Sequence, residues 1–186
     1  MSFSPRLEEA FAFAAEKHRE QVRKGSAVPY LTHLMAVAAC VGDHGGTEAQ
    51  VIAALLHDVV EDQDVSLDEL TARFGPEVAA IVAACTDVTA RPKPTWRARK
   101  EAHVARVRAA DASVKLVVAC DKLHNARSIV RDHRVLGPAV WRRFSASRAD
   151  SLWYYGAMAD ALAEGWSHPL VDELRGVIAT LETLPE

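Results

Sequence analysis

Long apolar runs are missing from this sequence, in which no stretch approaches the roughly 20 residues that a helix needs to cross a bilayer. The N-terminus, MSFSPRLEEA, has acidic residues where a signal peptide would have a basic and then an apolar segment. We therefore expect a cytoplasmic protein that makes no contact with membranes.

Cysteine is scarce, and basic charge is not in surplus. The three cysteines, Cys40, Cys85 and Cys120, are far apart in segments rich in Ala and Val, which argues against a disulfide framework or a CxxC metal site. We expect them to be small core residues. The net charge of −3 argues against a general nucleic-acid binder, because binding to the phosphate backbone needs a basic surface. Any anion site must then be a local cluster of cations.

The alternating pattern of β-strands is absent as well, whereas a helical period of apolar residues runs through most of the chain. With 49% hydrophobic and 25% charged residues, the composition is that of an ordinary globular domain. The sequence predicts an all-α fold, a single domain over residues 1–186 with about eight to nine helices. The expected helices cover residues 5–22, 30–43, 47–62, 66–74, 76–86, 96–110, 113–132, 141–164 and 169–183.

Local signals support several of these boundaries. Thr47 with Gln50, and Ser66 with Glu69, have the spacing of capping boxes, in which side chain and backbone satisfy each other at a helix start. Residues 87–95, DVTARPKPT, contain two prolines and form the clearest predicted loop.

The segment VIAALLHDVVED, residues 51–62, is unusual because an apolar run ends in ionisable residues. On a helix, His57 and Glu61 are four residues apart, as are Asp58 and Asp62, so the four side chains form one polar patch. Burying such groups without partners costs several kcal/mol each, whereas a cation would neutralise the carboxylates and use the imidazole lone pair. The alternative is a solvated helix end, with the histidine as a charge partner of the helix C-terminus.

A second apolar segment, VKLVVACDKLHN at residues 114–125, has the same anomaly. Asp121 and Lys122 follow directly after a run that is typical of a core helix, and Asn125 shares a helix face with Asp121. A buried ion pair of Asp121 with Lys115 or Lys122 is the simpler explanation, and both explanations stay open.

In a third segment, residues 30–40, His33 lies in the first turn of an apolar helix, where a histidine is commonly a satisfied core residue. Together the three segments supply two imidazoles and two carboxylates, which suit one Mn²⁺, Fe²⁺ or Zn²⁺ ion. Because two carboxylates offset the charge of a divalent cation, a polyanionic substrate would need further cations. Arg23, Lys24 and Lys122 are the candidates, although Arg23 and Lys24 also fit a basic helix end before a glycine.

On these residues the chain resembles the hydrolase domain of the RelA/SpoT-homologue family and, in length and order of motifs, its small alarmone hydrolases. The family has an all-helical HD domain and removes the 3′-pyrophosphate of guanosine tetra- and pentaphosphate with Mn²⁺. The matching segments are QVRKGSAVPYLTH at 21–33, AALLHDVVED at 53–62, SLDELTARFG at 66–75 and CDKLHNAR at 120–127.

The resemblance implies a role for each of these polar residues. The residues that match the ligands of one Mn²⁺ ion are His33, His57, Asp58 and Asp121. The acidic pair that positions and deprotonates the attacking water corresponds to Glu61 and Asp62. The residues that match substrate contacts are Arg23, against the nucleobase, together with Lys24, Lys122 and Asn125.

Three positions depart from the family pattern without removing a ligand. Leu34 stands where Pro is usual, Gln63 where Thr is usual and Cys120 where Ala is usual. Residues 87–103 are also less alike, and in the family this region helps to form the phosphate end of the pocket. The identity of the substrate therefore stays open.

Several side chains allow two readings. Arg97 and Lys100 are either phosphate contacts or part of a solvated helix face. The aromatic residues that either line a nucleoside pocket or belong to the core are Trp141, Trp153, Tyr154 and Tyr155.

The leading hypothesis is a metal-dependent phosphohydrolase that removes the 3′-pyrophosphate of the alarmone, a small-molecule nucleotide. A second hypothesis keeps the site but changes the substrate to another phosphorylated nucleotide, such as NADPH. A third is a catalytically silent nucleotide sensor, although the acidic pair argues against it. We expect a single metal ion, because only two of the eight histidines lie in the matching motifs and His103 is the sole further candidate ligand.

Overall fold

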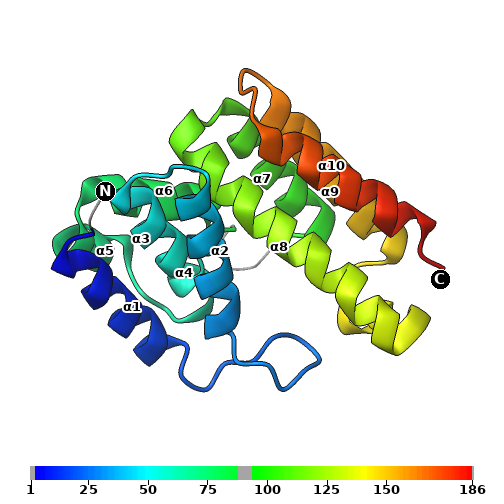
Figure 1. Ribbon diagram of the computed structural model, residues 1–186, viewed down its shortest axis with the longest axis horizontal. Coiled ribbons are helices and arrows are strands. Elements are labelled where there is room, and N and C mark those ends of the chain that lie inside the picture. The colour runs from blue at the N-terminus through cyan, green and yellow to red at the C-terminus, as the bar shows by residue number, and fades with distance from the viewer. Residues whose placement is uncertain (1–2, 88–93, 186) are drawn as a thin grey trace.

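The computed structural model describes residues 3–87 and 94–185 (Figure 1). Over these residues the chain forms helices and one isolated antiparallel bridge between Val22 and Pro29, without a strand, which confirms the predicted all-α class. No helix within this part of the chain is long and apolar enough to cross a membrane. The helices are α1 (Pro5–Lys17), α2 (Leu31–Asp43), α3 (Glu48–Leu56), α4 (Val59–Asp62), α5 (Leu67–Phe74), α6 (Pro76–Cys85), α7 (Trp96–Ala109), α8 (Ala112–Leu136), the 3-10 helix η1 (Gly137–Arg143), α9 (Arg148–Ala163) and α10 (Pro169–Thr183).

The long helix α8 lies between the other helices and contacts most of them. It runs diagonally between the group α1 to α6 and the group α7, α9 and α10 (Figure 1), and it packs against α2, α3 and α6 on one side and α7, α9 and α10 on the other. Its start is fixed by Asp111, whose carboxylate accepts hydrogen bonds from the backbone N–H groups of Ser113 and Val114. Helix α8 ends at Leu136 and is followed by Gly137, whose φ of 58° and ψ of −147° suit glycine. Because α8 contacts both groups of helices, its polar residues can face either group.

Helix caps agree with the predicted starts. At Thr47 both halves of the capping box with Gln50 are formed. At Ser66 the side chain accepts a hydrogen bond from the backbone N–H of Glu69. Each such cap contributes about 1 kcal/mol. The predicted loop 87–95 falls largely on residues 88–93, which lie outside the described residues.

The predicted helix 47–62 is wrong in one respect that matters for the site, because it is two helices. Helix α3 ends at Leu56, and α4 begins at Val59. Asp58 between them has φ of −105° and ψ of −3°, a conformation that turns the chain out of the α3 axis. The Asp58 carboxylate is thereby directed separately from the α3 side chains.

Three other predicted boundaries also differ. The helix expected over 5–22 ends at Lys17, because the chain then turns toward the Val22–Pro29 bridge. The helix expected over 113–132 continues to Leu136, and the one expected from 141 begins only at Arg148, where Ser147 caps it. Residues 137–143 form η1 instead.

Candidate metal centre and adjoining cavity

The four predicted metal ligands come together from three places in the fold. His33 lies in the first turn of α2, His57 and Asp58 lie at the break between α3 and α4, and Asp121 lies in the middle of α8. The Nε2 atom of His33 is 3.2 Å from Asp121 Oδ1 and 3.8 Å from Asp58 Oδ2. The Nε2 atom of His57 is 3.1 Å from Asp58 Oδ2 and 3.7 Å from Asp121 Oδ1. Two imidazoles therefore face two carboxylates at close range.

The hydrogen bonding of these histidines fits a cation. Both rings are buried, at 1% and 2% exposure, and within the described part of the chain neither Nε2 has a hydrogen-bond partner. His57 Nδ1 donates to the backbone oxygen of Ala54 at 2.7 Å, so its Nε2 is the atom that faces the carboxylates. Burial disfavours the charged ring, but the neighbouring Asp58 and Asp121 carboxylates raise the pKa of His57 well above its ordinary value, so a cation would displace a proton from Nε2. His33 Nδ1 lies 2.7 Å from Nδ1 of His124, and burial lowers the pKa of His33, so its ring is neutral. Nitrogen lone pairs that face carboxylate oxygens are the donor set of a divalent transition metal.

Neighbouring side chains hold the two carboxylates in place. The Tyr30 hydroxyl donates to Asp58 Oδ2 at 2.5 Å. Lys122 Nζ donates to Asp121 Oδ2 at 2.7 Å, and Asn125 donates to Asp121 Oδ1 at 2.5 Å. The ion pair of Asp121 with Lys122, considered above as an alternative to metal binding, is thus formed together with the four-residue cluster. Lys115 instead donates to the backbone oxygen of Glu164.

Glu61 and Asp62 lie on α4, one turn beyond Asp58. Asp62 accepts a hydrogen bond from Gln21 at 2.8 Å, and Glu61 accepts one from the backbone N–H of Asp87 at 3.3 Å. Burial raises the pKa of both carboxyl groups above their ordinary values. Both contacts are made outside the His33, His57, Asp58 and Asp121 cluster, so these two acids can exchange protons without occupying a ligand position.

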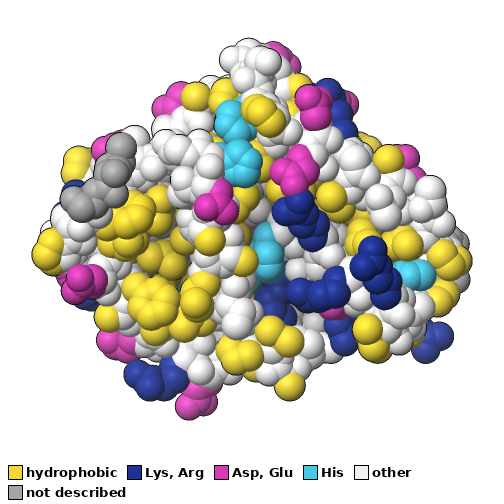
Figure 2. All heavy atoms as spheres, viewed as in Figure 1, with side chains coloured by type: hydrophobic (Ala, Val, Ile, Leu, Met, Phe, Trp, Pro, Cys, Tyr) yellow, Lys and Arg dark blue, Asp and Glu magenta, His cyan; other side chains and the backbone are white. Residues whose placement is uncertain are grey.

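A cavity of about 470 Å³ lies beside the cluster, between the loop before α2 and helices α8 and α9. Tyr30, Lys122 and Asn125 line it and also bind the cluster carboxylates, so they connect the two. Its lining has six basic side chains against one carboxylate, Asp132. Figure 2 shows Lys and Arg gathered over this region of the surface. The basic lining residues are Arg23, Lys24, Lys100, Lys122, Arg131 and Arg143.

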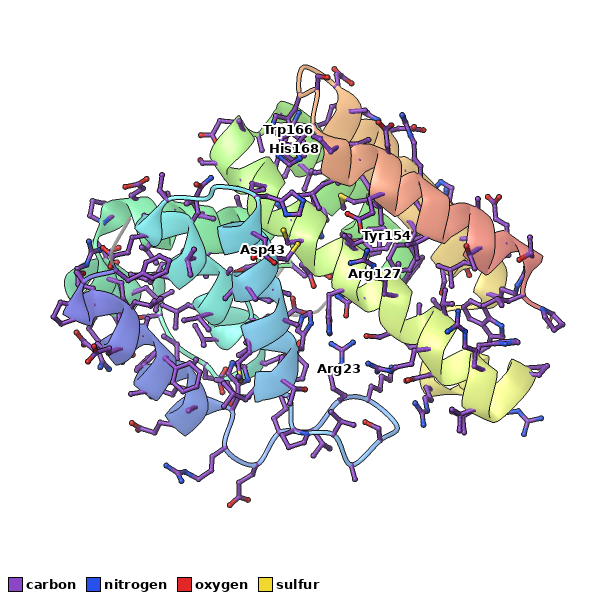
Figure 3. The ribbon with its side chains drawn as sticks, in the orientation of Figure 1. Arg23, Asp43, Arg127, Tyr154, Trp166 and His168 are labelled. Carbon is purple, nitrogen blue, oxygen red and sulfur yellow. The ribbon has the colours of Figure 1, made fainter. Side chains whose placement is uncertain are left out.

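Two of these cations are well suited to an anionic ligand. Arg23 reaches from the loop toward α8 (Figure 3), where it donates to Asn125 Oδ1 at 2.9 Å, and its guanidinium lies 5.9 Å from the Tyr30 ring centroid. Within the described residues neither Arg23 nor Lys24 forms an ion pair. By contrast, Arg143 pairs with Asp132 at 2.9 Å. The charges of Arg23 and Lys24 are therefore available to a phosphate.

Some of the residues that were either ligand contacts or structural residues line the cavity, and others do not. Lys100, Tyr154 and Tyr155 line the cavity. Arg97 instead pairs with Glu101 at 2.8 Å and stacks over the ring of Trp153. The lining of the cavity does not include Trp141.

His103, the one further candidate ligand, contacts a residue of α9. Its Nδ1 is 3.0 Å from the Tyr154 hydroxyl. Burial, with a smaller contribution from Lys122, lowers the pKa of His103 to about 3.

Sequence reasoning missed Tyr30, His124 and Gln21, which contact Asp58, His33 and Asp62 respectively. Two of these residues, Tyr30 and His124, could have been found from their spacing in the sequence. Tyr30 precedes His33 by three residues and His124 follows Asp121 by three, so on a helix each shares a face with a predicted ligand. Gln21 lies on a loop and had no such periodicity.

Comparison with known proteins agrees with this geometry. The family model described as an HD domain matches residues 10–151. The guanosine-3′,5′-bis(diphosphate) 3′-pyrophosphohydrolase MESH1 of Drosophila melanogaster is 33% identical, over 96% of this chain and 90% of that protein. MESH1 of Xenopus tropicalis is 40% identical, over 94% of this chain and 87% of that protein.

Solved structures give the same result. One described as a metazoan ortholog of SpoT that hydrolyzes ppGpp superposes with a TM-score of 0.82 at 28% identity, over 97% of both chains. A Listeria monocytogenes protein superposes with a TM-score of 0.74 at 29% identity, over 80% of this chain and 97% of that one. With its buried His and Asp cluster at the break after α3, this chain belongs to the HD-domain family and is a relative of the MESH1 hydrolases.

Proposed function

We propose that this protein is a metal-dependent phosphohydrolase that removes the 3′-pyrophosphate of guanosine tetra- and pentaphosphate. One observation carries the proposal: two buried imidazole nitrogens without partners face two carboxylates beside a cavity lined by cations. The names of the MESH1 relatives and of the SpoT-like structure support the substrate.

The proposed ligands of a single Mn²⁺ are His33, His57, Asp58 and Asp121. When bound, a divalent cation supplies a Lewis acid for the phosphoryl oxygen and lowers the pKa of water. Tyr30 holds Asp58 by its hydroxyl, and His124 orients the ring of His33. Such outer contacts fix the direction of each lone pair.

Glu61 and Asp62 take up the proton of the attacking water in this proposal. Their raised pKa values make them stronger proton acceptors than ordinary carboxylates, and general bases work best when their pKa approaches the working pH. Gln21 restrains Asp62 by a hydrogen bond at 2.8 Å.

Arg23, Lys24 and Lys122 hold the substrate. Asp58 and Asp121 offset the charge of the cation, so affinity for a polyphosphate must come from other cations. Arg23 faces the Tyr30 ring and Asn125, which suits a planar group that stacks on a base and forms directed hydrogen bonds. Tyr154 and Tyr155 add aromatic surface to the same cavity. The cytoplasmic location stays a prediction from the sequence.

Product identification tests the proposal. The protein is stripped of metal with a chelator, reloaded with Mn²⁺, and incubated separately with guanosine tetraphosphate, NADPH and GDP. We expect GDP and pyrophosphate from the first substrate, no turnover without metal, and loss of turnover in Asp121→Asn. The matched control is Asp160→Asn, which removes an exposed carboxylate on α9 that pairs with Arg175 and should leave turnover unchanged.

Other outcomes contradict the proposal in different ways. Release of phosphate from NADPH, with guanosine tetraphosphate left intact, would show that the site acts on NADPH, the second candidate substrate. Tight binding of the tetraphosphate without products, in metal-loaded protein, would indicate a sensor.

A further inference from the structure

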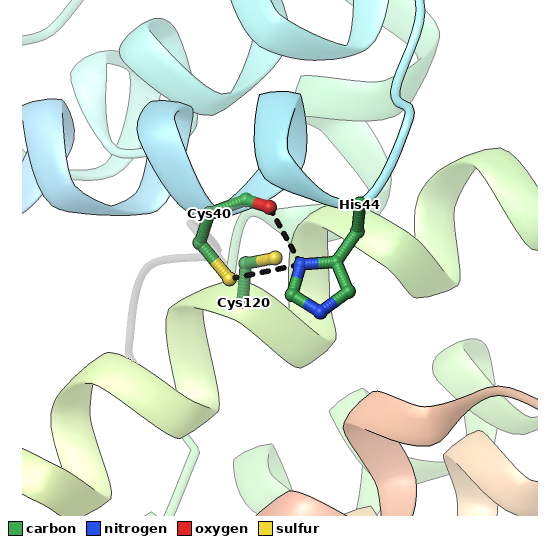
Figure 4. A group of neighbouring side chains, drawn as sticks. All are labelled: Cys40, His44 and Cys120. Carbon is green, nitrogen blue, oxygen red and sulfur yellow. Dashed lines mark hydrogen bonds between the residues drawn. The ribbon is translucent and has the colours of Figure 1, made fainter.

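A second group of potential metal ligands lies at the C-terminal end of α2. Cys40 and His44 come from α2 and its last turn, and Cys120 comes from the facing side of α8 (Figure 4). One ligand atom from each of the three lies within 4.8 Å of the other two. None of the three belongs to the cluster of His33, His57, Asp58 and Asp121.

The geometry of this group is close to that of a metal site. Cys40 and His44 are four residues apart, so their side chains share one face of the helix. Cys40 Sγ lies 3.9 Å from His44 Nδ1. In a tetrahedral zinc site, Zn–S bonds of ~2.3 Å and Zn–N bonds of ~2.0–2.1 Å place sulfur and nitrogen about 3.6 Å apart. A shift of a few tenths of an ångström would bring Cys40 Sγ and His44 Nδ1 to that spacing, and the ligand atom of Cys120 already lies within 4.8 Å of both residues.

We propose that Cys40, His44 and Cys120 bind a soft divalent cation such as Zn²⁺, at a site separate from the hydrolase centre. Two thiolates and one imidazole are donors that select Zn²⁺ over the hard ions Mg²⁺ and Ca²⁺. Cys40 and His44 are partly exposed, whereas Cys120 is fully buried, so the site is open on one side. Water completes the fourth position.

The nearby His168 caps the start of helix α10. Its ring centroid is 5.6 Å from that of His44, and its Nδ1 accepts a hydrogen bond from the Leu170 backbone N–H at the start of α10. The same ring stacks on Trp166 with centroids 4.5 Å apart, a pair that Figure 3 labels. Because one nitrogen caps α10, His168 is not counted among the ligands.

Binding requires a defined exchange of protons. His44 Nδ1 donates to the backbone oxygen of Cys40 at 2.9 Å, so the free ring has its proton on Nδ1. A cation that binds Nδ1 leaves the proton on Nε2 instead, and each thiol that becomes a ligand releases one proton to solvent. No electron is transferred, and the cation keeps its charge.

Cobalt is a direct probe of this site, because Co²⁺ bound to thiolate has a sulfur-to-metal charge-transfer absorption. Reduced, metal-free protein is titrated with Co²⁺. We expect this absorption to saturate within about two equivalents in the wild type, because the hydrolase centre can take up one Co²⁺ without it, and Zn²⁺ to abolish it by displacement. The absorption should persist in His57→Ala, because the hydrolase centre contains no sulfur, and should be lost in both Cys40→Ala and Cys120→Ala.

Matched variants make the test specific. Cys85→Ser removes the third cysteine, on α6, and should leave the absorption unchanged. His44→Ala should weaken Co²⁺ binding at least tenfold. Absence of the absorption from the wild type, its survival in Cys120→Ala, or its loss in Cys85→Ser would overturn the proposal. If the buried Cys120→Ala variant unfolds, as judged by circular dichroism, the partly exposed Cys40→Ala variant decides.

Discussion

The division of the acidic residues into metal ligands and proton acceptors can be tested by three isosteric substitutions. Asp121→Asn removes a charge that faces both imidazoles and Lys122. Glu61→Gln and Asp62→Asn remove charges outside the ion pairs that join the two imidazoles to Asp58 and Asp121, and each new amide oxygen can still accept the existing hydrogen bond from Asp87 or Gln21. The shape of the site is preserved in all three variants.

The expected magnitudes differ between the two classes. Loss of a general base costs about 10² to 10⁴ in rate, so Glu61→Gln and Asp62→Asn should each lower kcat by at least about 10², which is about 2.7 kcal/mol of activation free energy. Their metal affinity should change little. Asp121→Asn should lose more metal affinity than the 10- to 100-fold typical of an outer-sphere partner, because it removes a proposed direct ligand.

Two independent assays separate these classes. Metal affinity is measured by titration of metal-free protein with Mn²⁺, and turnover is measured at saturating Mn²⁺ with guanosine tetraphosphate. The reasoning fails if Asp62→Asn loses Mn²⁺ as readily as Asp121→Asn, because Asp62 would then be a ligand. It also fails if Asp121→Asn retains Mn²⁺ with wild-type affinity.

Three further predictions use single substitutions. Arg23→Lys should raise KM for guanosine tetraphosphate in steady-state kinetics with metal affinity unchanged, since an ammonium group cannot stack or form two directed bonds; an unaltered KM would refute this. His124→Phe should lower Mn²⁺ affinity about 10- to 100-fold in the titration above, because His33 loses the contact that orients its ring, and equal affinity would contradict that role. His103 has a pKa of about 3 in the fold, so the unfolded chain binds its proton at higher pH and stability falls as pH drops below about 6.5. In urea denaturation, His103→Gln should lose less stability than the wild type between pH 7 and pH 5, and equal losses would refute the assignment.

The helices and the candidate site residues could be predicted, because both produce local patterns in the sequence. Apolar periodicity located the helical segments, and ionisable residues at the ends of apolar runs pointed to His57, Asp58 and Asp121, which the fold brings together. The break after Leu56 could not be predicted, because VIAALLHDVVED is a continuous helical pattern and Asp58 leaves the α3 axis through tertiary contacts such as the Tyr30 hydroxyl. At this break, tertiary packing overrides the helix propensity of the sequence.

Contacts between distant segments were the part that the sequence did not reveal. The cysteines were expected to be small core residues, which fits the burial of Cys120 but not its place beside Cys40 and His44. Eighty residues of chain separate Cys40 from Cys120, and no CxxC spacing marks them. Only the packing of α2 on α8 brings them together.

One turn of α8 contributes residues to the candidate metal centre, to the adjoining cavity and to the Cys40–His44–Cys120 group. Successive residues on a helix are rotated by about 100° and rise by about 1.5 Å, so neighbours along the chain serve different surroundings. Cys120 faces the end of α2, Asp121 faces the two imidazoles, and Lys122 and Asn125 reach both Asp121 and the cavity. His124 holds the ring of His33 from the same turn. A change in the rotation of α8 would therefore move Asp121, the proposed substrate contacts and Cys120 together, because a helix turns as a rigid unit.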